Sequence, residues 1–156
     1  WESAAFAFRD ELCMRTVALR TAFVISKESD AFKRMSVPAR FGLGAPLGSG
    51  RQYLPWIHLD DLCRIYLNTV EDSRMQGIYN AVSPQQITNA EFMKVLAKEM
   101  KRPFFIPRIP AFILRLFMGE AAGMILEGSR VSPQKIVDAG YQFLYPTAME
   151  AIRSSL

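Results

Sequence analysis

The amino-acid sequence predicts an α/β fold that ends in a helical part. Residues 16–25 (TVALRTAFVI) and 77–82 (GIYNAV) are short, apolar and rich in β-formers, and the segment between them includes apolar residues at helical spacing. Of the 156 residues, 50% are hydrophobic and 22% are charged, which is the balance of a chain that buries a core. Strands that alternate with helices and are followed by further helices indicate the α/β class.

The first elements are a helix and a strand. Residues 1–14 have helical character without a capping residue before them, and the sequence opens on Trp1, so we expect it to begin inside a longer protein. Residues 16–25 are apolar nearly throughout, which predicts a strand buried on both faces of a parallel sheet. Residues 27–35 form a short helix candidate. Residues 41–50 (FGLGAPLGSG) predict a loop, because Gly and Pro interrupt regular structure.

Residues 52–59 predict a second extended segment, and either Asp60 or Asp61 is suited to cap the helix after it. That helix has apolar or small residues at helical spacing, which predict one buried face: Leu62, Ile65, Tyr66, Thr69 and Val70. Residues 77–82 form the next strand.

The helical part opens with a capping box, in which Glu91 follows Thr88 by three residues. It predicts an amphipathic helix over residues 89–100 whose inward positions are Phe92, Val95, Leu96 and Met100. Residues 104–106 predict a third short strand. Residues 111–118 and 120–126 predict helices that are apolar around most of their circumference and therefore buried against a partner surface. A last helix is predicted over residues 147–155.

Composition and charge exclude several classes of protein. The net charge is +4, and no basic run alternates with aromatic residues, so we expect no nucleic-acid partner. The longest apolar stretch, residues 104–126, is interrupted by charged residues and prolines, so we expect no membrane span. Cys13 and Cys63 lack the spacing of a metal site and predict two reduced thiols in a cytoplasmic protein.

Three segments in order carry a resemblance to a known family: residues 47–61 (LGSGRQYLPWIHLDD), 77–92 (GIYNAVSPQQITNAEF) and 126–146 (LEGSRVSPQKIVDAGYQFLYP). The chain resembles the C-terminal half of an extended short-chain dehydrogenase/reductase, in the NAD(P)-dependent epimerase-like family. The resemblance implies the C-terminal part of a Rossmann-type parallel sheet over residues 1–82, with an inserted Gly-rich loop at 41–50. A small, mainly helical substrate-side domain over residues 83–156 follows, and the N-terminal Gly-rich half is absent.

Two features of that family are missing from the sequence. Residues 41–50 are disfavoured as a dinucleotide phosphate loop, because a short strand and no helix follows them directly. The catalytic Tyr-x-x-x-Lys pair is absent, since no tyrosine is followed by a lysine four residues on. We therefore expect no catalytic residue in this chain and no tight binding of NADP or NAD without the N-terminal half.

The expected partners are that N-terminal half or another copy of the chain, together with an unknown small-molecule substrate. An alternative is a non-catalytic interaction module that oligomerises through an exposed sheet edge. A third possibility, a carrier of apolar ligands, is less favoured.

The resemblance implies a cofactor contact at the end of the first strand. Val24 is the expected contact, through its main chain, with Phe23 and Ser26 as its neighbours. Ligands of open α/β sheets bind at such strand ends.

The substrate-cleft candidates are Arg51, Trp56, Asn80 and Arg130. Many sugar-nucleotide epimerases have a G-x-G-x-Q-x-R-D-F pattern whose arginine clamps the substrate diphosphate. Here Leu54 occupies the position of that arginine, so the resemblance implies that the clamp is lost. Asn80 is suited either to line the cleft or to bond to nearby backbone at a strand end.

His58 is the single histidine and precedes Asp60 and Asp61. This arrangement permits acid–base chemistry. The resemblance favours a structural role, in which this region ends a strand and caps the following helix.

Overall fold

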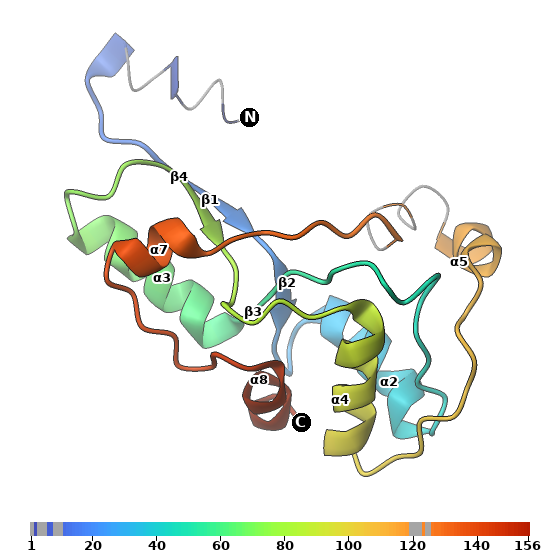
Figure 1. The fold of residues 1–156 in the computed structure, drawn as a ribbon. Helices are drawn as coiled ribbons and strands as arrows, with labels where there is room; N and C mark the ends of the chain where they lie inside the picture. The colour runs from blue at the N-terminus through green and yellow to red at the C-terminus, as the bar shows by residue number, and fades with distance from the viewer. Residues whose placement is uncertain (1, 3–5, 8–10, 119–122, 124–125) are drawn as a thin grey trace.

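The computed structural model describes residues 2, 6–7, 11–118, 123 and 126–156 (Figure 1). In chain order the elements are β1 (Val17–Thr21), β2 (Phe23–Ile25), α2 (Asp30–Arg40), β3 (Trp56–His58), α3 (Leu59–Glu71), β4 (Gly77–Ala81), α4 (Asn89–Glu99), α5 (Ala111–Met118), α7 (Gln134–Asp138) and α8 (Ala148–Ser154). No helix in these ranges is long and apolar enough to cross a membrane.

The described strands form two parallel pairs, β1 with β4 and β2 with β3. The change of partner occurs at one residue: the amide of Ala22 donates to the carbonyl oxygen of Ala81, and the next amide donates to that of Pro55. The predicted single strand over residues 16–25 is therefore two strands. The prediction that it is buried on both faces is also wrong for this chain, since Arg20 and Thr21 are exposed where β1 ends.

Helix α3 begins as predicted directly after β3, but its cap differs. The N-cap residue is His58, whose Nδ1 accepts a hydrogen bond from the amide of Asp60. Leu62, Ile65 and Thr69 are buried, while the other two positions predicted for that face, Tyr66 and Val70, are exposed. Helix α3 therefore has an apolar surface wider than the one it buries.

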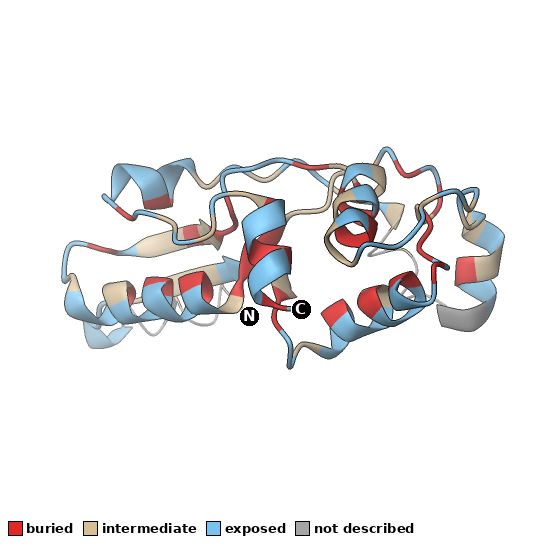
Figure 2. Cartoon of the chain, turned by 90° about the horizontal axis from the view of Figure 1, so that it is seen from below, coloured by how far each residue is buried: buried red, intermediate tan, exposed pale blue. Residues whose placement is uncertain are grey.

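Helices α4 and α8 share the same beginning. Thr88 and Thr147 are N-caps of complete capping boxes with Glu91 and Glu150. This confirms the predicted start of α4, while α8 begins one residue after its predicted start. α4 packs against α2 and α8, and Figure 2 shows their buried residues on the inward sides. These helices, with β2 and β3, enclose a core that includes Ile25, Phe32, Trp56, Phe92, Leu96 and Ile152.

Helix α2 differs from its prediction: it begins after Ser29 and continues through Pro38 to Arg40, instead of covering residues 27–35. The hydroxyl of Ser29 accepts a hydrogen bond from the amide of Phe32 and so fixes this start.

The connection from α4 to α5 also differs. Residues 104–106 are not a strand; instead Leu47, in the loop over residues 41–50, bridges to Ile109. The pairing is limited to a single bridge because proline has no N–H group, and Pro107 and Pro110 lie on either side of the bridge residue.

The helical tail adds two further observations. In α5, Phe112 and Leu116 are 70% and 78% exposed, so the described residues do not supply the partner surface against which this helix was predicted to be buried. Helix α7 was not predicted, because its five residues are too few to show helical periodicity. Most of the helices predicted over residues 1–14 and 120–126 lie outside the described residues.

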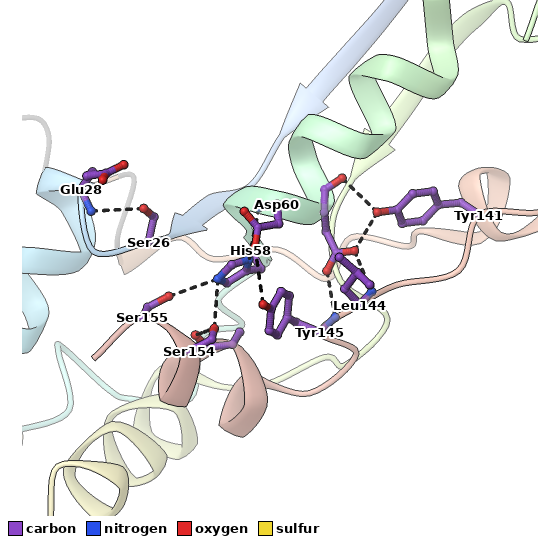
Figure 3. A network of polar contacts seen from close by, with 11 residues as sticks. Ser26, Glu28, His58, Asp60, Tyr141, Leu144, Tyr145, Ser154 and Ser155 are labelled. Carbon is purple, nitrogen blue, oxygen red and sulfur yellow. Dashed lines mark hydrogen bonds and ion pairs between the residues drawn. The ribbon is translucent and has the colours of Figure 1, made fainter. Parts of the chain in front are cut away.

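The buried carboxylate of Asp61, which has no exposed surface, joins the start of α3 to the segment over residues 141–145. Its Oδ1 accepts hydrogen bonds from the Tyr141 hydroxyl at 2.7 Å and the Leu144 amide at 2.8 Å, and Oδ2 accepts one from the Tyr145 amide at 3.0 Å. Figure 3 shows these donors gathered at the start of α3. Burial, followed by the hydrogen bond to Asp61, raises the pKa of Tyr141 well above its usual value.

We expect Asp61→Ala to lower the free energy of unfolding by about 3 kcal/mol or more, because it leaves buried donors without an acceptor. The control is Asp60→Ala, since the Asp60 side chain is 59% exposed; it should change stability by less than about 0.5 kcal/mol. Urea unfolding followed by circular dichroism measures both. Equal losses in the two variants would contradict the role given to Asp61.

Candidate functional site: the carboxyl edge of the sheet

The candidate site is a pocket of about 360 Å³ beside the carboxyl ends of β1 and β4. Parallel neighbours end at the same edge of a sheet, and this edge is where open α/β sheets bind ligands. The pocket is lined by Arg20, Thr21, Ala22, Pro55, Asn80, Val82, Arg130, Val131 and Ser132. The structure thus brings two of the predicted cleft residues, Asn80 and Arg130, into one pocket.

Arg130 is exposed and is held at two points. Its Nε donates to Oε1 of Gln86 at 2.7 Å, and its guanidinium lies 4.8 Å from the ring centroid of Tyr53. Within the described part of the chain its other N–H groups have no hydrogen-bond partner. The guanidinium is therefore oriented and can still donate to an anionic or polar ligand.

Asn80 fastens the segment that carries Arg130. Its Nδ2 donates to the carbonyl oxygen of Ser132 at 3.2 Å. This contact with nearby backbone is one of the two roles that the sequence allowed. Asn80 therefore both lines the pocket and fixes its opposite wall.

Arg20 is a pocket residue that was not predicted. Its Nε and Nη2 donate to the two carboxylate oxygens of Glu2, each at 2.7 Å. This bidentate pair lowers the pKa of Glu2 and raises that of Arg20. No local signal in the sequence indicates it, because Arg20 lies near the middle of the single strand predicted over residues 16–25 and only the division into β1 and β2 places it at a strand end.

The three predicted cofactor residues lie outside this pocket. Val24 is partly buried and pairs with Ile57 across β2 and β3, while Phe23 contacts the Phe92 ring edge-on at a centroid distance of 5.9 Å. Ser26 is buried, and its hydroxyl accepts a hydrogen bond from the amide of Glu28. Their contact with a cofactor stays a prediction.

The remaining two cleft candidates are also apart from the pocket. Trp56 has no exposed surface, and its indole Nε1 donates to the carbonyl oxygen of Gln85 at 3.1 Å, so in this chain it is a core residue. Arg51 is exposed, and its amide donates to the hydroxyl of Ser49 in a turn. The structure does not bring either residue to Arg130.

His58 is built into the fold. Its Nδ1 caps α3, and its Nε2 lies 3.1 Å from Oγ of Ser154 and 3.3 Å from that of Ser155 (Figure 3). The ring is buried and lies 3.9 Å, centroid to centroid, from the ring of Tyr145. Because Nδ1 accepts a hydrogen bond, it must be unprotonated. The geometry supports the structural role.

We expect acid to weaken the fold through this residue. Burial lowers the pKa of His58 below its usual value, despite Asp60 and Asp61. The unfolded chain therefore takes up the proton first, and the stability that His58 contributes above about pH 6.5 is lost as the pH falls through its folded pKa.

The measurement is urea unfolding between pH 7.5 and 5.5, compared with His58→Gln. Glutamine cannot titrate, and His58 is the only histidine, so the variant should lose less stability over this range. An equal loss in both proteins would assign the pH dependence to other groups.

Among the described residues, no group of three or more His, Cys, Asp or Glu side chains could hold a metal ion. At the pocket, Arg20, Asn80 and Arg130 present side-chain groups that can bind and orient a polar ligand.

Comparison with known proteins agrees with this fold. Residues 109–155 match a family model described as a domain of unknown function, DUF1731. The mouse epimerase family protein SDR39U1 is 40% identical over 154 residues, which cover 98% of this chain and 52% of the relative. An epimerase family protein of Staphylococcus saprophyticus is 34% identical and is covered to 48%. The chain thus spans about half the length of these relatives.

Solved structures give the same result. The crystal structure of human SDR39U1 isoform 2 with NADPH is similar with a TM-score of 0.87 and 36% identity, over 91% of this chain and 48% of that one. The Thermus thermophilus UDP-glucose 4-epimerase complexed with NAD has a TM-score of 0.71 at 17% identity, over 99% of this chain and 49% of that one, and shows the shared fold alone.

The fold therefore defines the class: this is an α/β chain of the Rossmann type, as predicted. The chain is similar to about half the length of epimerase family proteins, which confirms the resemblance carried by its three sequence segments.

Proposed function

We propose that this chain supplies the substrate-side wall of the active-site cleft in an NAD(P)-dependent epimerase or oxidoreductase. The observation that carries the proposal is the pocket at the carboxyl edge of β1 and β4, where Asn80 and Arg130 meet. The NADPH in the crystal structure of the human relative supports a nicotinamide cofactor for the complete protein. In this proposal the cofactor loop and the catalytic pair come from the part of the relatives that the chain does not match.

Arg130 has the role of a substrate-binding residue in this proposal. Its Nε is held by Gln86 and its face by Tyr53, so the remaining N–H groups are oriented without a change of rotamer. A guanidinium presented in this way favours a ligand with a phosphate or carboxylate group. The carbonyl oxygens beside it can accept hydrogen bonds from a polar substrate, and the hydroxyl groups can both donate and accept them.

The location in the cell is part of the same proposal. Cys13 and Cys63 are both free and exposed, which supports a reducing compartment such as the cytoplasm.

Cofactor binding tests the division of roles. We expect the chain alone to bind NADPH with a Kd weaker than about 1 mM, and a chimaera that joins it to the unmatched half of mouse SDR39U1 to bind at least about 100-fold tighter, because only the chimaera would hold the cofactor loop. Isothermal titration calorimetry measures both. Tight binding by the chain alone would overturn the proposal.

The role of Arg130 is tested in the same chimaera with UDP as the anionic probe. Arg130→Ala should weaken UDP binding about tenfold, through the loss of charge-assisted hydrogen bonds, and leave NADPH binding within about twofold. Arg34→Ala is the control, since Arg34 is exposed on α2 and outside the pocket; it should change neither affinity. Unchanged UDP binding in Arg130→Ala would remove Arg130 from the substrate wall.

A further inference from the structure

Basic residues are concentrated in two segments of the chain. Residues 31–59 and 100–118 together contain eight Lys and Arg residues and no Asp or Glu, whereas the other residues contain 11 basic and 15 acidic ones. The net charge of +4 is therefore the difference between a strongly basic part and an acidic remainder. A charge divided in this way favours an anionic partner on one side of the molecule.

The loop after α2 lies against the segment that leads into α5. The amide of Gly48 donates to the carbonyl oxygen of Ile109 at 2.8 Å. Gly42 approaches the other segment so closely that a Cβ atom on it would lie 3.4 Å from Cγ of Pro103. Two segments far apart in the sequence thus form one surface, and α5 extends it at the end of the molecule opposite to α3 and α7 (Figure 1).

This surface, residues 40–48 and 101–116, is called the basic face. Its exposed basic side chains are Arg40, Lys101, Arg102, Arg108 and Arg115. Within the described part of the chain, none of these five side chains takes part in a hydrogen bond or an ion pair. By contrast, Arg20, Arg74 and Arg153 each pair with a carboxylate. The cationic groups of the basic face are therefore available to an anionic partner.

Exposed apolar side chains lie among these charges on α5. Phe112 and Leu116 are one helical turn apart and point outward, while Leu114, on the opposite side of the helix, is buried. Arg115 lies on the same outward side, since it is three residues from Phe112 and adjacent to Leu116. The outer side of α5 therefore presents aromatic, aliphatic and cationic groups together.

Three more apolar side chains project from the segments beside α5. Phe41 and Phe105 are 77% and 76% exposed, and Leu43 is 58% exposed. Side chains exposed to this extent project into solvent and are not the walls of a closed groove. Several projecting apolar groups on one face of a protein mark an interaction site.

The chemistry of the basic face fits an anionic lipid surface. Interfacial segments combine Phe and Leu, which enter the boundary between headgroups and acyl chains, with Lys and Arg, which bind anionic headgroups. Projecting apolar side chains suit that insertion, whereas a protein partner requires a continuous, closely packed contact. Nucleic acid is less favoured as the partner, because the aliphatic Leu43 and Leu116 offer no ring on which a base could stack.

We propose that the basic face attaches the protein reversibly to a bilayer that carries anionic headgroups. The rings of Phe41, Phe105 and Phe112 enter the interface, and the basic side chains lie at the level of the headgroups. Such a contact lies on the membrane surface and needs no spanning helix. The cytoplasmic leaflet carries anionic lipids, so the contact is consistent with the proposed cytoplasmic location.

The test is sedimentation of the chain with vesicles of phosphatidylcholine, alone or with about 30% phosphatidylserine. We expect binding at least about 25-fold stronger to the anionic vesicles at low salt, since each Lys or Arg near such a surface contributes about fivefold. At about 0.5 M NaCl, where the Debye length is below about 5 Å, most of this difference should disappear. Equal binding to both kinds of vesicle, or binding to neither, would overturn the proposal.

Matched variants locate the contact on the molecule. Arg115→Gln and Leu116→Ser should each weaken binding to the anionic vesicles about fivefold, through the loss of one charge or one inserted side chain. Arg64→Gln and Leu67→Ser are the controls, because both residues are exposed on α3, at the opposite end of the molecule; they should change binding less than about twofold. Urea unfolding of each variant verifies that it remains folded.

Equal losses in the variants of α5 and of α3 would assign the binding to net charge or to apolar exposure in general, and so contradict the proposal. The chimaera with the unmatched half of mouse SDR39U1 gives the last measurement. We expect it to bind the anionic vesicles within about threefold of the chain alone; loss of binding would show that the added half covers the basic face. No measurement uses NADPH or UDP, so a failure here is distinguishable from a failure of the proposed function.

Discussion

The paths of the segment over residues 141–145 and of the end of α8 depend on the polar contacts at the junction of β3 and α3. Asp61 is fully buried and accepts hydrogen bonds from the side chain of Tyr141 and the backbone of residues 144 and 145. Three residues earlier, His58 joins the same junction to the end of α8. A buried carboxylate is stable only when hydrogen-bond donors surround it. The hydrogen bonds to Asp61 therefore fix the path of the segment over residues 141–145. That path sets where α8 packs and where α7 meets the sheet.

This constraint also determines the pocket. The segment that carries Arg130 precedes helix α7, and α7 is fixed to β4 by Lys135. Asn80 adds a direct contact at Ser132. The wall opposite the carboxyl ends of β1 and β4 is thus held by hydrogen bonds to the sheet and needs no rearrangement to face a ligand. The pocket is therefore formed jointly by the carboxyl ends of β1 and β4 and by the segment over residues 130–132.

The two outer edges of the β1–β4 sheet differ in their hydrogen bonding. β4 ends the sheet, because its outward carbonyl groups are satisfied by Lys135 and Val82. β1 has no such protection within the described residues, and α3 presents apolar side chains beside it. The hydrophobic residues of the sequence therefore fill the enclosed core and also occur on exposed surfaces, at Tyr66, Leu67 and Val70 of α3 and at Phe112 and Leu116 of α5.

Local features were predictable from the amino-acid sequence alone, because each is encoded within a few neighbouring residues. The capping box of Thr88 and Glu91, the Gly-rich loop over residues 41–50 and the strand over residues 77–82 all follow from such short patterns. Features that depend on residues far apart in the chain required the folded structure. The division of residues 16–25 into β1 and β2 results from two different pairing partners, and the burial of Trp56 and Asp61 results from segments that follow them by up to 84 positions. The meeting of Asn80 and Arg130 has the same cause, since no local signal specifies which loop returns to a strand end.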